Sequence, residues 1–236
     1  EDGFEVEGDF AAEEEFDAEE DYLTAGEPEQ ASEAVLRHRA LTSRRRCPDI
    51  GQDNWMLLRP GDGLLAAFLI PMIIMLIIFA QRGIYPFGEE SFLRTDMYHQ
   101  YAPFFSEFRN KLANGESLLY SWNVGMGVNF SALYAYYLAS PLNCLLILCP
   151  GDRVIEFMTY MIVFKTGLCG LSMAWYLGKH CQSKDIGIAF FGIFYALSGY
   201  MAAYSWNIMW LDCIILFPLI MLGLELLVRE GKGLLY

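Results

Sequence analysis

Four stretches of apolar residues along the chain are long enough to cross a membrane as α-helices. They cover approximately residues 64–81, 154–178, 186–204 and 211–228. At about 1.5 Å per residue, a helix of roughly 20 residues crosses a hydrocarbon core about 30 Å thick. The pattern therefore predicts an all-α integral membrane protein, a polytopic helical bundle with about four spans.

A fifth apolar stretch, residues 131–149, is predicted not to cross the membrane. It contains Pro141, and its first half is rich in tyrosine and serine. Counting it as a span would place the basic residues that follow the second and fourth spans outside the cell, against the positive-inside bias. We therefore expect this stretch to lie in the interface, or to dip in and out, within a long outer loop of about residues 82–153.

The middle of this loop has the spacing of an amphipathic helix. Between Met97 and Ala113, apolar residues stand at positions 97, 101, 104, 105, 108 and 112, which is one face of a helix. Pro103 suits the first turn and Gly115 suits the end. The polar residues on or near the other face are Glu107, Arg109, Asn110 and Lys111. The spacing predicts interfacial helices that lie along the membrane surface.

The chain before the first span has a different composition. Residues 1–33 hold fifteen of the 29 acidic residues and no lysine or arginine. A segment so acidic and so poor in aliphatic residues is predicted to be a disordered tail. Residues 34–62 form a basic juxtamembrane segment, whose arginines place the N-terminus in the cytoplasm. More than sixty residues precede the first span, so we expect a retained anchor and not a signal peptide.

Candidate chemistry is concentrated at one membrane face, since the chain contains no nucleotide-binding, zinc-protease or serine-hydrolase motif. The six cysteines include no close CxxC pair, so we interpret them as packing residues and predict no metal site. No cofactor is identified. The polar groups expected at the outer face are Glu89, Glu90, Arg94, Asp96, His99, Gln100, Trp122, Asn123, Asn129, Asn207 and Asp212.

Three of the charged residues have two interpretations each. Asp96 could cap the following helix, or act as a general base or cation ligand at the membrane face. Asp212, near the start of the last span, could be a cap or a functional acid. Lys165 lies in the middle of the second span, where it needs a buried partner or a polar cavity.

The order of motifs resembles the N-terminal part of the bacterial YfhO family over about residues 82–236. The matching strings are TDMYHQYAPFFSEFRNKL, SWNVGMGVNFSALYAYYLASPLNCL, FKTGLCGLSMAWYL, FYALSGYMAAYSWNIMWLD and LFPLIMLGLELL. Members of this family are long polytopic proteins that resemble C-type glycosyltransferases, which carry a catalytic acid in the first outer loop. The acidic tail and the later spans of the family lie outside the resemblance.

The resemblance implies a membrane glycosyltransferase that takes a sugar from a polyprenyl-phosphate carrier. It implies an envelope-polymer acceptor such as lipoteichoic acid, outside the cytoplasm of a multi-pass cell-membrane protein, and no nucleic-acid partner. By position, Asp96 matches the catalytic acid. The substrate-binding candidates are Arg94, His99, Gln100, Tyr101, Trp122, Asn123, Asn207 and Asp212. Arg94 would neutralise the carrier phosphate, because a guanidinium matches phosphate geometry.

Two other classes of function remain open at this point. A transporter or flippase would suit the mid-span Lys165 and the glycines within the spans, Gly167, Gly170, Gly192 and Gly199. A non-catalytic scaffold for other envelope enzymes would need none of the outer-loop acids.

Overall fold

A computed structural model describes residues 62–93, 96–182, 186–231 and 233. The predicted acidic tail, nearly all of the basic juxtamembrane segment and Arg94 lie outside these residues. The helices are α3 (Asp62–Gln81), α4 (Ala102–Asn114), α5 (Phe130–Leu133), α6 (Val154–His180), α7 (Ile186–Ala196), α8 (Gly199–Tyr204) and α9 (Ile208–Glu230). Two π-helical turns, η1 (Met97–Tyr101) and η2 (Tyr134–Leu138), and two 3₁₀ segments, η3 (Pro141–Leu148) and η4 (Gly151–Arg153), complete the helical elements.

Four helical segments are long and apolar enough to cross a membrane, as the hydrophobic pattern predicted. They are Gly63–Gln81, Gly151–His180, Ile186–Tyr204 and Ile208–Arg229. The third segment is interrupted between α7 and α8. The fourth begins at Ile208, three residues before the predicted start at residue 211, so Asp212 lies inside the helix and does not cap it.

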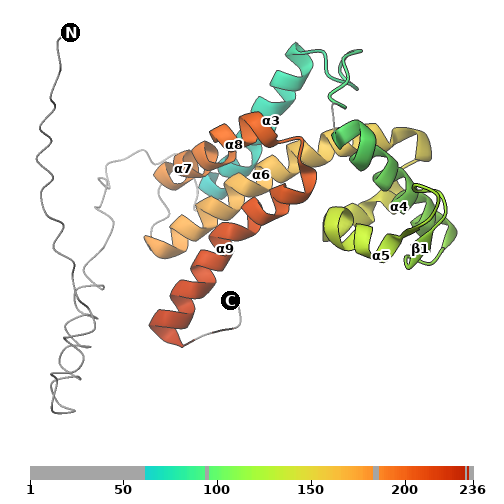
Figure 1. Cartoon of the computed structure of the whole chain (residues 1–236). Coiled ribbons are helices and arrows are strands. Elements are labelled where there is room, and N and C mark those ends of the chain that lie inside the picture. The colour runs from blue at the N-terminus through green and yellow to red at the C-terminus, as the bar shows by residue number, and fades with distance from the viewer. Residues whose placement is uncertain (1–61, 94–95, 183–185, 232, 234–236) are drawn as a thin grey trace, which may run out of the picture. The chain divides into compact units, whose positions relative to one another are not determined.

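Helix α6 is the central helix of the bundle and packs against α3, α7 and α9 (Figure 1). In its most apolar window 61% of the residues are buried, against 22% in each of the other three spans. Glycines allow this close packing. A Cβ on Gly170 would lie 2.1 Å from the carbonyl oxygen of Ala67 in α3, and one on Gly192 would lie 2.6 Å from the carbonyl oxygen of Gly170. Close helix contact thus accounts for these two glycines without a moving bundle.

The long connection between α3 and α6 carries the remaining elements, which gather near one end of α6 (Figure 1). Its second half contains the apolar stretch that was predicted not to cross the membrane. There the segments Phe130–Leu138 and Pro141–Leu148 meet at an angle of 106°. Pro141 begins the second segment, where a missing backbone N–H costs no helical hydrogen bond. The two short pieces form an elbow at residues 139 and 140.

The amphipathic stretch forms η1 followed by α4. Pro103 lies in the first turn of α4, and Gly115 ends the helix with a left-handed φ of 65°, as the end signals predicted. Met97, Tyr101, Phe105 and Phe108 are buried, as expected from their spacing. The opposite face differs from the prediction, because Glu107 and Lys111 are buried as well.

A small hairpin explains the burial of these two charged residues. Strands β1 (Tyr120–Ser121) and β2 (Val128–Asn129) pair antiparallel, and the chain between α4 and β2 folds over the polar face of α4. The sequence pattern alone showed that this face is polar. It did not show that a two-stranded hairpin covers it.

Candidate functional site

Asp96 stands at the start of η1 with an exposed side chain. It occupies the N-cap position of this turn, but its side chain makes no capping hydrogen bond. Its Oδ1 instead accepts a hydrogen bond from Nε2 of Gln100, at 3.3 Å. The carboxylate is therefore held from one side and remains open to solvent on the other.

Gln100 connects Asp96 to the elbow. While its amide nitrogen donates to Asp96, its Oε1 accepts a hydrogen bond from the hydroxyl of Tyr137 in η2. The ring of Tyr137 also packs edge-on against the ring of Tyr101, with 5.5 Å between the centroids. Gln100 and Tyr101, neighbours in the π-helical turn η1, thus both contact Tyr137. Such turns are frequent at functional sites.

Tyr101 connects the same turn to the start of the last span by a hydrogen bond. Its side chain is buried, and its hydroxyl donates to Oδ1 of Asn207, the residue before α9. Burial raises the pKa of Tyr101, because the charged phenolate would be poorly solvated there. The phenol thus stays protonated as a hydrogen-bond donor. Asp96, Gln100, Tyr101, Tyr137 and Asn207 together form what we term the Asp96 cluster.

An ion pair between the buried Lys165 and the partly exposed Asp212 lies beside this cluster. The ammonium group of Lys165 in α6 contacts Oδ2 of Asp212 in α9 at 2.7 Å, and it donates to the carbonyl oxygen of Ile208 at 3.2 Å. Oδ1 of Asp212 accepts a hydrogen bond from Ser140 at the elbow, at 3.1 Å. The partner that the sequence required for Lys165 is therefore Asp212, whose own side chain is partly exposed.

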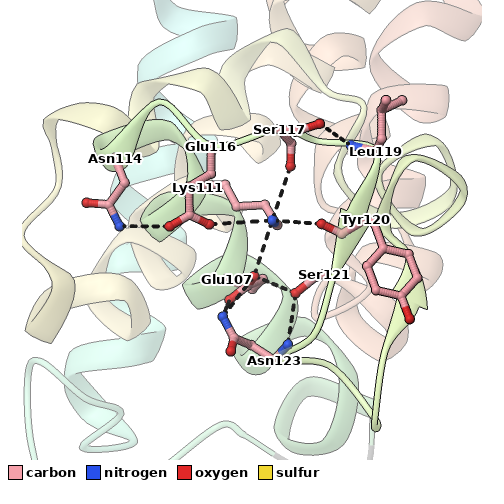
Figure 2. Close-up of polar contacts among 9 residues, drawn as sticks. All are labelled: Glu107, Lys111, Asn114, Glu116, Ser117, Leu119, Tyr120, Ser121 and Asn123. Atoms are coloured by element: carbon pink, nitrogen blue, oxygen red, sulfur yellow. Dashed lines mark hydrogen bonds and ion pairs between the residues drawn. The ribbon is translucent and has the colours of Figure 1, made fainter.

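A second polar centre lies between α4 and the hairpin (Figure 2). The carboxylate of Glu107 accepts hydrogen bonds from Ser121 Oγ at 2.6 Å and from Asn123 Nδ2 at 3.1 and 3.3 Å. One turn later, Lys111 Nζ donates to the carbonyl oxygens of Ser117 and Tyr120, at 3.1 and 2.9 Å. The two charges lie 3.6 Å apart. We term these contacts the Glu107–Lys111 network.

The hairpin displays its apolar residues outwards above this network. The side chain of Trp122 is 76% exposed and that of Met126 is 99% exposed. Met126 lies in a tight turn, in which it and its two flanking glycines all have positive φ. Gly127 has φ 112°, a backbone conformation that residues with a Cβ rarely adopt, so glycine is favoured there.

The predicted site residues thus fall into separate groups. Asp96, Gln100, Tyr101 and Asn207 meet in one cluster, with Asp212 nearby through the elbow. Trp122 and Asn123 lie on the hairpin, where Asn123 bonds to Glu107. His99 is exposed and its ring packs edge-on against Tyr98, with 5.2 Å between centroids. Arg94 lies outside the described residues.

Several residues of these networks were missing from the predicted site, among them Tyr137, Ser140 and Glu107. Tyr137 belongs to a group of aromatic residues typical of an interfacial belt, and Glu107 stands at a position typical of an exposed helix face. No local signal distinguishes them, because their partners are distant in sequence: 37 residues separate Tyr137 from Gln100 and 72 separate Ser140 from Asp212. In the described part of the chain, no three His, Cys, Asp or Glu side chains are grouped so that they could hold a metal ion.

Comparison with known proteins identifies a family for this chain. The model of the family described as bacterial membrane protein YfhO matches residues 66–236. No curated protein and no solved structure matches the chain. The family match covers the four spans and both polar centres, well over half of the chain. The protein therefore belongs to the YfhO family of bacterial membrane proteins.

Proposed function

We propose that this protein is a membrane glycosyltransferase that uses a sugar linked to a polyprenyl phosphate and glycosylates a cell-envelope polymer of the lipoteichoic acid kind. The observation that carries the proposal is the setting of Asp96. Its carboxylate is exposed, yet Gln100 holds it in place, and contacts to Tyr137 and Asn207 fix that turn against the elbow and the last span. A general base needs this combination of access and fixed geometry.

In the proposed reaction, Asp96 accepts the proton of an acceptor hydroxyl as the hydroxyl oxygen attacks the anomeric carbon of the sugar. The new bond joins that carbon to the acceptor oxygen, and the bond from the same carbon to the carrier phosphate breaks. The phosphate leaves with the bonding electrons and remains on the polyprenyl chain. Arg94, two residues before Asp96, would bind the departing phosphate.

The location of the proposed donor in the membrane also supports the proposal. A polyprenyl chain stays in the lipid, so its phosphate presents the sugar at the level of the interface. The connection that carries Asp96 joins the first two spans, which places it at a membrane face where such a donor would be reached. We propose that this is the outer face and that the N-terminus is cytoplasmic.

The remaining predicted residues take supporting roles in this scheme. Asn207 and Tyr101 would fix the wall beside the reacting groups, and Asp212 would fix the elbow. His99 is exposed and would contact the donor. Trp122 and Asn123 would form an acceptor subsite on the hairpin, since an exposed indole ring offers an apolar face to a sugar ring.

The test uses the full-length gene in a deletion strain, with glycosylation of the cell-wall polymer measured at matched membrane abundance. Asp96→Asn should abolish the added sugar, because the amide cannot accept the proton. The matched control is Asp152→Asn, which changes another exposed acid of the same connection and should leave the sugar unchanged. Normal glycosylation with Asp96→Asn would refute the proposed role of Asp96.

A further inference from the structure

Lys165 is completely buried in the middle of the most enclosed span. A charged group at that depth is costly and persists only with strong partners. Its ammonium group has two partners, both of them in α9, the carboxylate of Asp212 and the carbonyl oxygen of Ile208. An apolar side chain of similar length would fill the same space without the cost of burying a charge, so the retained charge calls for an explanation beyond packing.

Each of the two contacts of Lys165 is linked to the Asp96 cluster through neighbouring residues. Ile208 follows Asn207, whose side-chain oxygen accepts a hydrogen bond from the Tyr101 hydroxyl. On the other side, Asp212 accepts a hydrogen bond from Ser140 at the elbow. Three residues before Ser140 stands Tyr137, which donates to Gln100.

Two residues of the η1 turn, Gln100 and Tyr101, are therefore connected through other residues to the buried ammonium group of Lys165. Through the start of α9, Lys165 supports the contact that holds Tyr101. Through Asp212 and the elbow, it supports the contact that holds Gln100, the only residue of the described chain seen to hydrogen-bond the Asp96 side chain. Removing the ammonium group would leave the Asp212 carboxylate unpaired and free to shift away from Ser140.

We propose that Lys165 is a positioning residue, which fixes the start of α9 and the elbow and so sets the position of Asp96 at the membrane face. Lys165 is fully buried and touches no substrate in this scheme. The structural half of the inference stands on the contacts alone. Its consequence for catalysis rests on the proposed transferase function.

The experiment compares Lys165→Met with wild type in the full-length protein in nanodiscs, by hydrogen–deuterium exchange and by sugar transfer. Lys165→Met should raise exchange about tenfold or more in peptides that cover residues 97–101 and 134–143, with α3 unchanged. It should lower kcat on the order of 100-fold at little change in KM, because a displacement of about 1 Å at a reacting group has this effect. The matched control is Lys179→Met, the same substitution at an exposed lysine near the end of the same helix, which should change neither readout.

Two further variants keep the test decisive if Lys165→Met folds poorly. Lys165→Arg keeps the charge and should restore most of the protection in both peptides. Lys165→Met/Asp212→Leu removes both charges, so it should fold well, yet it should still loosen the elbow because leucine cannot accept from Ser140. Wild-type exchange of residues 97–101 and 134–143 in this double variant would overturn the inference, since the ion pair would then serve stability only.

The two proposals can fail separately. If both peptides lose protection while Asp96→Asn leaves the sugar unchanged, Lys165 positions the turn as inferred and the proposed catalytic role of Asp96 is refuted. If Asp96→Asn abolishes transfer while both peptides keep their protection in Lys165→Met and in the double variant, the positioning role is refuted and the function stands.

Discussion

The Glu107–Lys111 network allows the effect of burial on an ion pair to be measured with a matched pair of substitutions. Lys111 Nζ lies 3.6 Å from a carboxylate oxygen of Glu107 and also 3.6 Å from one of Glu116 (Figure 2). The two acids share the same cation at the same distance. They differ in exposure, since the side chain of Glu107 is 6% exposed and that of Glu116 is 49% exposed.

Changing each acid to glutamine should therefore have unequal effects. Glu107→Gln keeps the shape but leaves Lys111 without its buried counter-charge and turns one acceptor into a donor that faces the Asn123 amide. Breaking a buried pair from one side costs about 3 kcal/mol or more, and hydrogen bonds to a charged group contribute about 1.5–3 kcal/mol each. Glu116→Gln loses a half-exposed pair, which contributes about 0–1 kcal/mol.

The assay is hydrogen–deuterium exchange of the hairpin in the full-length protein. Useful amides are those of Phe130, which donates to the Leu119 carbonyl oxygen at 3.0 Å, and of Asn123, which donates to Ser121 Oγ at 3.1 Å. A loss of about 3 kcal/mol should raise local opening, and hence exchange, about 100-fold in Glu107→Gln. Glu116→Gln should change it less than about fivefold. Equal effects of the two substitutions would refute the reasoning that burial decides the strength of these pairs.

Two further predictions concern the packing of the spans and the acceptor. Gly170→Ala should destabilise the bundle by about 1–3 kcal/mol, because its Cβ would lie 2.1 Å from a backbone oxygen of Ala67. The control is Gly199→Ala, where the added Cβ would lie in open space. Equal melting temperatures of the two variants in detergent would contradict this account. Trp122→Ala should raise the KM for the acceptor about tenfold at unchanged kcat, because roughly 1.4 kcal/mol of binding free energy would be lost. Met126→Ala on the same hairpin should leave KM unchanged. An unaltered KM in Trp122→Ala would show that the hairpin does not bind the acceptor.

The hydrophobic pattern alone determined the class of this protein. Long apolar stretches predict spans because backbone polar groups in lipid must be satisfied within a helix. The charge bias and Pro141 predict that residues 131–149 do not cross the membrane, and the structure bends this segment by 106°. Pro103 and Gly115 marked the limits of α4 because each restricts or permits a local backbone conformation.

The sequence also indicated which residues of the site to consider, but it did not indicate which of them meet. Asp96, Gln100, Tyr101 and Asn207 were singled out as polar groups near one face, and Lys165 was known to need a partner. Their pairing depends on contacts across tens of residues, such as Tyr101 with Asn207 and Lys165 with Asp212. Local periodicity carries no information about such distant contacts.

The exposure of charged residues was likewise decided by tertiary structure. Glu107 and Lys111 have the spacing of a solvated helix face, yet the hairpin covers them and pairs their polar atoms. A helical pattern shows which residues share a face. What covers that face depends on how the rest of the chain folds back, because burial is a property of the packed molecule and not of the local sequence.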